Sequence, residues 1–266
     1  MNQPPETIPL HSQNPLGRFS DRAEDYANYR PSYPSAAIDW ILEGMGLPSE
    51  LTIADVGAGT GISARLMADR GIRVWAIEPN AAMRNAAVPH PLIEFCNATA
   101  EQTQLPNQSV DLVLCGQSFH WFNKPIALEE FHRILKPSGR LILMWNDRNL
   151  EDPFTLAFSQ IVSQAADRQI FDQTDRKSGS VLKHSPFFTH FRTHTLFHTH
   201  PLNLAGLTGL VLSSSYIPKS GAAHKQLLQE LTALHHHWSQ SSPDRTVPLS
   251  YRVNLYLADR ANEAIA

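Results

Sequence analysis

Leu51-Thr52-Ile53-Ala54-Asp55-Val56-Gly57-Ala58-Gly59-Thr60-Gly61 is the stretch of the sequence that decides the fold. Its apolar, β-branched first half predicts a buried strand, and its alternate glycines leave room for a ligand to lie against bare backbone. Ile62, Leu66 and Met67 then recur on one face of a predicted helix. Gly71 stands where the C-cap of that helix belongs. A strand, a glycine turn and a helix in this order open a nucleotide-binding α/β unit.

The composition bounds the kind of protein. The 266 residues are 42% hydrophobic, which suffices for one domain that carries insertions or for a domain and a half. The net charge of −3, without a basic cluster, argues against a nucleic-acid-binding protein. The longest mostly apolar stretch, Leu204 to Leu212, is far shorter than the roughly 18 residues of a membrane span, and Met1 to Gly17 has no apolar signal region. We therefore expect a cytoplasmic protein that binds neither nucleic acid nor membrane.

Further strands follow the opening unit. Runs typical of strands cover residues 72–78, 92–97, 109–115 and 140–145, with helices predicted between them. This alternation predicts a parallel sheet with right-handed crossovers. Later in the chain we expect helices over 153–169, 203–216 and 221–238, strands over 191–199 and 247–257, and a polar loop over 172–179.

The residues before the opening unit are rich in aromatic side chains. Ser20 or Asp21 is predicted to cap a short helix that carries Tyr26, and prolines separate it from a second helix over 35–44. These aromatic residues suit either a lid over the ligand or plain packing onto the sheet.

The glycine turn has several candidate ligands. A dinucleotide fingerprint needs G-x-G-x-x-G, but Gly61 comes one residue early and Ile62 occupies the fingerprint position. A phosphate loop is excluded because no lysine follows the turn. The pattern Asp55-x-Gly57-x-Gly59-x-Gly61 resembles instead the class I S-adenosylmethionine-dependent methyltransferases. The resemblance implies S-adenosyl-L-methionine as the cofactor and S-adenosyl-L-homocysteine as its product.

Other motifs resemble the same family. Glu78-Pro79-Asn80 with Met83 resembles its ribose motif, and an acid at the end of the second strand accepts hydrogen bonds from both ribose hydroxyls in such folds. Ala100-Glu101 resembles its adenine contact, although Ala98 stands where relatives often carry glycine. Gln117, after the fourth strand, is a further candidate for cofactor binding.

A narrower resemblance is to a subgroup that includes trans-aconitate methyltransferase-like enzymes. It is carried by Tyr26, residues 29–34, 119–122, Trp145-Asn146 and 213–216. The family implies a Rossmann-like α/β fold with a seven-stranded, mostly parallel, doubly wound sheet of order 3-2-1-4-5-7-6, whose last strand is antiparallel, capped by N-terminal and late helices.

The sequence and the resemblance together lead us to expect a domain organisation. Residues 1–17 are expected to be loose or disordered, and 18–266 to form a single methyltransferase domain. Within it we expect lid helices over 18–46, a cofactor-binding core over 51–147, helical insertions with a late strand over 148–240, and the last strand over 247–258.

The catalytic candidates lie after the fourth strand. Methyl transfer is an in-line displacement, so the enzyme has to position the nucleophile and exclude water. His120 is the candidate base if a hydroxyl or amine is methylated, whereas it would only orient a carboxylate. A histidine simply packed against Trp121 is the alternative. Trp121 and Trp145 are expected to wall the acceptor pocket and to face the sulfonium, or else to be core residues.

The sequence says less about the methyl acceptor and about the oligomeric state. Tyr26, Arg30, Arg148 and Tyr216 are candidates for binding an acidic substrate, because guanidinium groups hold carboxylates well. The sequence predicts a small-molecule methyltransferase acting at a carboxylate or hydroxyl oxygen, as a monomer or homodimer. A non-catalytic cofactor sensor and a nicotinamide-dependent oxidoreductase are the alternatives. No metal is expected, since no cysteine or carboxylate completes a ligand set near His194, His198 and His200 or near His235 to His237.

Overall fold

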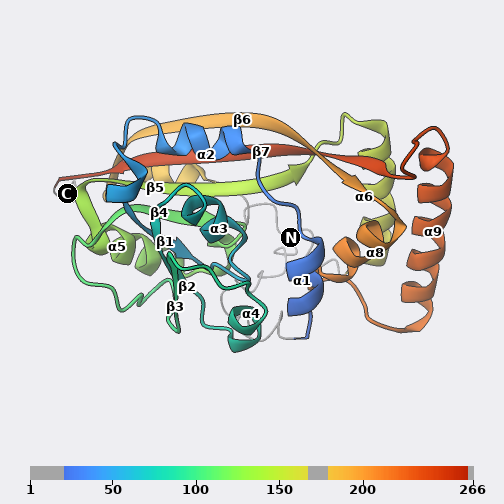
Figure 1. The fold of residues 1–266 in the computed structure, drawn as a ribbon, viewed down its shortest axis with the longest axis horizontal. Coiled ribbons are helices and arrows are strands. Elements are labelled where there is room, and N and C mark those ends of the chain that lie inside the picture. The colour runs from blue at the N-terminus through green and yellow to red at the C-terminus, as the bar shows by residue number, and fades with distance from the viewer. Residues whose placement is uncertain (1–20, 167–178, 263–266) are drawn as a thin grey trace, which may run out of the picture.

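A seven-stranded sheet forms the centre of the computed structural model, which describes residues 21–166 and 179–262 (Figure 1). The strands are β1 (Thr52–Val56), β2 (Arg73–Ile77), β3 (Ile93–Cys96), β4 (Val110–Gly116), β5 (Leu135–Arg148), β6 (Phe188–Leu202) and β7 (Val247–Arg260). Their order is β3-β2-β1-β4-β5-β7-β6. β1 to β5 pair in parallel, whereas β7 is antiparallel to both β5 and β6. The predicted strand order and antiparallel last strand are confirmed.

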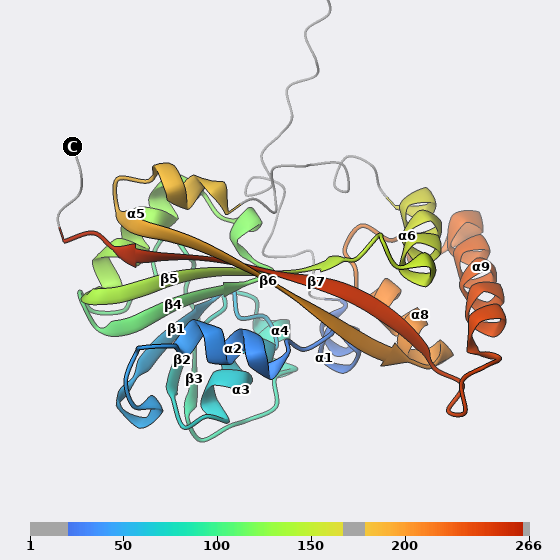
Figure 2. The same ribbon diagram turned by 90° about the horizontal axis from the view of Figure 1, so that it is seen from above.

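Helices cover both faces of this sheet (Figure 2). The helices are α1 (Ala23–Tyr29), α2 (Ser35–Leu42), α3 (Ile62–Ala68), α4 (Ala81–Asn85), α5 (Lys124–Ile134), α6 (Pro153–Ala165), α8 (Leu204–Leu212) and α9 (Gly221–Ser239), with short 3-10 turns η2 (Pro48–Glu50), η3 (Phe119–Trp121) and η5 (Ser180–His184). Side chains alternate along β4: Leu112 packs with α2 and α3, and Val113 packs with α5. A strand that is buried on both faces reads as a continuous apolar run, which is why β4 was predictable.

The late helices gather at one end of the sheet. α6, α8 and α9 bury Phe158, Leu207 and Leu231 together with Leu249 of β7 in an apolar cluster separate from the two that line the sheet faces. Figures 1 and 2 show these helices beside α1, beyond the end of β5 at which its arrowhead points. In parallel sheets ligands bind outside the carboxyl ends of the strands. A ligand site is therefore expected at this end of the sheet.

Several predicted boundaries are corrected. β6 and β7 are longer than predicted because they pair with each other almost throughout, and β5 is longer because it pairs with β4 from Leu135 and with β7 up to Arg148. α6 and α8 end earlier, at Ala165 and Leu212. The N-cap of α1 is Arg22, without a side-chain cap; Asp21 pairs with Lys219 instead. Ser20, the expected loose segment 1–17 and the expected polar loop up to residue 178 lie outside the described residues.

Across 21–166 and 179–262, no helix is both long and apolar enough to cross a membrane. In the same ranges, no group of three His, Cys, Asp or Glu residues is placed to hold a metal ion.

Candidate active site

Three glycines in the turn after β1 have left-handed backbone conformations. Gly57, Gly59 and Gly61 have φ angles of +68°, +58° and +80°, which glycine adopts without strain. A Cβ on Gly57 would lie 2.5 Å from the Cβ of Ser118, beyond the end of β4. A larger residue therefore does not fit at position 57. The turn of Gly57, Gly59 and Gly61 between two strand ends is called the cradle below.

Asp55 is buried beneath this cradle. Its Oδ2 accepts a hydrogen bond from the Ser63 hydroxyl at 2.7 Å, whereas its Oδ1 is buried without a partner. Burial raises the pKa of Asp55 to about 7, although the Ser63 hydroxyl and the backbone N–H of Ala64 act in the opposite direction. An unpartnered buried oxygen is costly, so this position fits a cationic or hydrogen-bond-donating group of a ligand.

Glu78 directly follows β2 and accepts a hydrogen bond from the glycine turn. Its Oε2 accepts a hydrogen bond from the backbone N–H of Gly59, and its Oε1 accepts one from the backbone N–H of Asn80, each at 2.8 Å. Burial raises the pKa of Glu78, and the two amides oppose this shift. Each carboxylate oxygen has a second lone pair, so Glu78 retains capacity for two hydroxyl groups. The side chain of Met83 lies beside Gly59, where a Cβ would be 3.3 Å from its terminal methyl group.

The remaining cofactor candidates lie at neighbouring strand ends. Ala100 is buried after β3, and the Glu101 carboxylate accepts from the Asn123 amide at 2.8 Å, at the start of α5. Gln117 follows β4 with a φ of +57°, and its side-chain amide donates to the Asn146 carbonyl at 3.0 Å. Pro79 directly follows Glu78. The structure thus collects the predicted cofactor residues around the ends of four adjacent strands.

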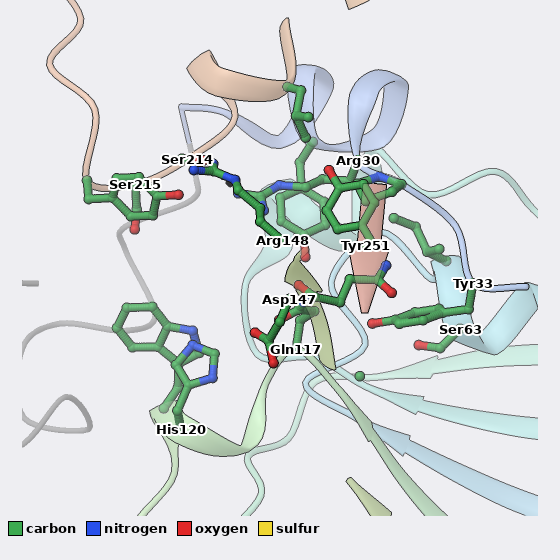
Figure 3. Close-up of a pocket in the computed structure, with 18 of the residues that line it drawn as sticks. Arg30, Tyr33, Ser63, Gln117, His120, Asp147, Arg148, Ser214, Ser215 and Tyr251 are labelled. Atoms are coloured by element: carbon green, nitrogen blue, oxygen red, sulfur yellow. Dashed lines mark hydrogen bonds between the residues drawn. The ribbon is translucent and has the colours of Figure 1, made fainter. Parts of the chain in front are cut away.

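A cavity of about 360 Å³ lies beside the cradle (Figure 3). The sequence-predicted residues that line it are Tyr26, Arg30, Gln117, His120, Trp121, Arg148 and Tyr216. They come from α1, the segment after β4, the end of β5 and the segment after α8. Elements that are far apart in the sequence therefore meet around one space.

Trp145, predicted to wall the acceptor pocket, lies instead in the core. Its side chain is fully buried and meets Tyr256 edge-on, with ring centroids 5.6 Å apart. Side-chain alternation along β5 explains this, because Trp145 shares a face with Leu143 while its neighbour Asn146 lines the cavity. The indole N–H of Trp145 donates to Nδ1 of His120 at 3.4 Å.

His120 lies in η3, against Trp121. The two ring centroids are 5.0 Å apart and the rings are tilted by 44°. Both residues line the cavity, so packing against Trp121 and facing a ligand are compatible.

Two guanidinium groups reach the cavity. Arg30 donates to the Ser213 carbonyl at 3.3 Å and to the Ser214 hydroxyl at 3.2 Å, yet its buried Nε–H has no partner. The Arg148 guanidinium carbon lies 4.7 Å from the centroid of the Phe158 ring. Among the described residues, the Arg148 guanidinium donates no hydrogen bond and forms no ion pair.

Sequence reasoning missed some of the lining residues. The polar ones that were not singled out are Ser63, Asp147, Ser159 and Tyr251, whereas Tyr33, Asn146, Ser214 and Ser215 stood in motifs of the narrower resemblance without a role of their own. Asn146 and Asp147 had a signal, since polar residues directly after an apolar strand mark the ligand-binding edge of a parallel sheet. Ser159 and Tyr251 had none, because only the packing of α6 and β7 brings them here.

The fold and the site define a class of protein. A sheet of this order with a glycine turn after β1 and a buried acid after β2 is the Rossmann-like architecture of the class I methyltransferases. Comparison with known proteins agrees. A model of the methyltransferase domain matches residues 54–143.

Sequence relatives give the family. An uncharacterized methyltransferase of Mycobacterium tuberculosis is 34% identical over 207 residues, which are 77% of this chain and 79% of the relative. An uncharacterized methyltransferase of Schizosaccharomyces pombe is 34% identical over 152 residues, which are 56% of this chain and only 61% of the relative. The chain belongs to the methyltransferase family.

Solved structures share the fold. A putative type II methyltransferase from Anaeromyxobacter dehalogenans has a TM-score of 0.59 at 21% identity, covering 89% of this chain and 99% of that one. A geranyl diphosphate C-methyltransferase from Streptomyces coelicolor, in complex with S-adenosyl-L-homocysteine, has a TM-score of 0.52 at 16% identity, covering 97% and 100%. At these identities the likeness concerns the fold alone.

The protein is therefore an S-adenosylmethionine-dependent methyltransferase. Family membership sets aside nicotinamide-dependent oxidoreduction. Nothing in these comparisons favours a non-catalytic sensor.

Proposed function

We propose that this enzyme methylates a carboxylate oxygen of a small acidic molecule. The observation that carries the proposal is Arg148, a cavity-lining guanidinium that has no hydrogen bond or ion pair among the described residues. Such a group is a ready partner for a carboxylate, which it can hold by two parallel hydrogen bonds. Arg30 adds a second guanidinium with a buried, unpartnered N–H.

Neutral polar groups of the cavity support a polar acceptor. The Ser159 hydroxyl and Oδ1 of Asn146 are buried without partners, and both residues line the cavity. Buried polar atoms are normally hydrogen-bonded, so a ligand with donors and acceptors would satisfy them. A cavity of about 360 Å³ also suits a small molecule.

The strand ends fit the cofactor. We assign the cradle of Gly57, Gly59 and Gly61 with Asp55 to the amino-acid part of S-adenosylmethionine, whose ammonium group complements the open carboxylate oxygen. We assign Glu78, flanked by Pro79 and Met83, to the ribose hydroxyls. The adenine is assigned to Ala100 and Glu101, and Gln117 to the space between cofactor and acceptor.

The chemistry then needs little from the protein beyond position. The bound cofactor supplies a methyl group on a positively charged sulfur. The acceptor oxygen forms a bond to the methyl carbon as the carbon–sulfur bond breaks, and the sulfur keeps the electron pair. A carboxylate is already ionised near neutral pH, so no proton has to be removed. The protein has to hold the carboxylate in line with the carbon–sulfur bond and to exclude water. We assign the exclusion of water to α1 and the segment after α8, which line the cavity.

We also propose the narrower kinship with trans-aconitate methyltransferase-like enzymes. Its support is that Tyr26, Arg30 and the segment Ser214 to Tyr216, which belong to the motifs that carry the resemblance, line the same cavity.

A labelled-methyl assay tests the acceptor class. The enzyme is incubated with methyl-labelled cofactor and panels of small carboxylic acids, phenols, alcohols and amines. We expect label in acids, and Arg148→Gln should raise KM for the acid by about 10- to 100-fold with unchanged cofactor affinity, because it loses a charged hydrogen-bond pair. Arg252→Gln, on the surface of β7, is the control. Label only in phenols or alcohols would favour a hydroxyl oxygen and contradict the carboxylate.

A further inference from the structure

We infer that His120 acts on the acceptor as a hydrogen-bond donor through Nε2–H, and that Trp145 is the positioning residue that fixes this tautomer. The indole nitrogen of Trp145 lies 3.4 Å from Nδ1 of His120. An indole N–H only donates. Nδ1 must therefore present its lone pair to Trp145, and the proton of the neutral imidazole lies on Nε2.

The core holds this arrangement in place. Trp145 is fully buried on β5, between β4 and β7, and its ring packs edge-on against Tyr256. A buried indole N–H without an acceptor is unfavourable, so the contact with His120 is retained. Trp121 also packs against the imidazole, which restrains the rotation of the ring.

This geometry opposes a role as general base. The lone pair that would accept a proton faces the core, and protonation of Nδ1 would set two N–H groups against each other. Nε2 lies across the ring from Trp145, in a residue that lines the cavity. The inference rests on the proposed function and deepens it: an enzyme without a base at this position selects acceptors that arrive already ionised.

Other titratable groups share the cavity and bear on any pH profile. They are Tyr26 and Arg30 near α1, Tyr33 before α2, Asp147 and Arg148 of β5, Tyr216 after α8 and Tyr251 of β7. Burial raises the pKa of Tyr26, Tyr33 and Tyr251, which keeps these phenols protonated in the neutral range. These three phenols are therefore not available as bases for the acceptor near neutral pH.

Nuclear magnetic resonance tests the tautomer without any acceptor. Long-range proton–nitrogen spectra of the full chain with labelled histidine distinguish protonated from unprotonated ring nitrogens, and the spectrum of His120→Gln assigns the signals. We expect His120 to carry its proton on Nε2 near pH 7, and Trp145→Phe to remove this preference. A proton on Nδ1, or the same tautomer in Trp145→Phe, would overturn the inference.

Kinetics test the role. Glutamine donates a hydrogen bond but is no base, so His120→Gln should keep kcat within about 10-fold of the wild type, whereas a lost base costs about 10²–10⁴-fold. His120→Ala should fall further than His120→Gln. Equal losses in both variants would contradict the donor role. A wild-type kcat, measured at saturating cofactor and acceptor, that rises about tenfold per pH unit between pH 5.5 and 7 would also contradict it.

Trp145→Phe separates positioning from folding. We expect its KM for the acceptor to rise while cofactor affinity stays unchanged. If the variant does not fold by circular dichroism, His120→Gln and the wild-type spectra still decide the inference. If no acid is methylated by the wild type, the proposed function fails, whereas the tautomer stands or falls on the spectra alone.

Discussion

Asp55 and Glu78 are two buried carboxylates at the same edge of the sheet, and they differ in how far their oxygens are satisfied. Both oxygens of Glu78 accept backbone amides of the chain, whereas Asp55 leaves Oδ1 without a partner. Glu78 therefore helps to hold the turn even before a ligand binds, and Asp55 has an oxygen to offer to the ligand. The sequence predicted both residues as cofactor candidates but not this difference.

Glu78→Ala tests the ribose assignment. It should weaken cofactor binding by roughly 1–3 kcal/mol through loss of charged hydrogen bonds. Because Glu78 also accepts from the Gly59 amide, a lower melting temperature is expected as well. Isothermal titration with S-adenosylhomocysteine measures the affinity. An affinity equal to that of the wild type in a folded variant would remove Glu78 from the ribose site.

Asp55 makes stability depend on pH. Burial raises its pKa to about 7, from 3.8. Between these values the folded protein binds a proton that the unfolded chain has lost. This contribution to the free energy of unfolding is complete below about pH 4 and is lost as pH rises to about 7. Chemical denaturation of wild type and Asp55→Asn should show a difference that changes across this window and is constant above it.

Cofactor binding should show the opposite trend. The cofactor's ammonium group favours the charged carboxylate, so binding should release a fraction of a proton near pH 6–7 and tighten as pH rises through this range. Titration calorimetry in buffers of different ionisation enthalpy measures the released proton. Asp55→Asn should release less, and proton release identical to the wild type would show that Asp55 is not the responsible group.

The glycine turn is an element whose shape depends on close approach as well as on backbone angles. Gly57 and Gly71 both have positive φ, +68° and +87°, but only Gly57 faces a neighbour, Ser118. Gly71→Ala should therefore cost about 1–2 kcal/mol of stability from strain alone, and Gly57→Ala more, with loss of cofactor binding. Thermal unfolding and cofactor titration of the two variants provide the comparison. Equal effects would mean that the contact with Ser118 is not limiting.

Arg22, at the start of α1, links this helix to the C-terminal end of α8 by hydrogen bonds. The Arg22 guanidinium, 8% exposed, donates to the carbonyls of Leu212, Ser214 and Ile217 at 2.6 to 2.7 Å. These carbonyls lie at and beyond the C-terminal end of α8, where a cation also suits the helix dipole. Arg22 thereby ties the start of α1 to the segment after α8 that lines the cavity.

Arg22→Gln tests this tie. It should lower the free energy of unfolding by about 2–4 kcal/mol, because charged hydrogen bonds to buried carbonyls are lost. Arg252→Gln removes a surface ion pair with Glu151 and should cost at most about 1 kcal/mol. Urea denaturation of both variants measures the difference. Similar small costs would mean that Arg22 does not hold α1 to α8.

At the scale of the whole molecule, the sequence predicted the sheet better than the site. The central strands are apolar on both faces, and their runs are readable from the sequence. The face of the sheet on which Trp145 lies could not be predicted from the sequence. The length and register of β5 depend on its pairing with β7, about a hundred residues later in the chain. The same holds for Ser159 and Tyr251, which reach the cavity only through the packing of α6 and β7.

The chemical nature of the transferred methyl group tests the carboxylate proposal most directly. Methyl esters release methanol in mild alkali, whereas methyl ethers and methylamines do not. After reaction with methyl-labelled cofactor and the preferred small acid, we predict that the label in the product is released by alkali and that Arg148→Gln forms less of it. Label that stays in the product after alkali, or cofactor that binds tightly while no acid is labelled, would contradict methylation of a carboxylate oxygen.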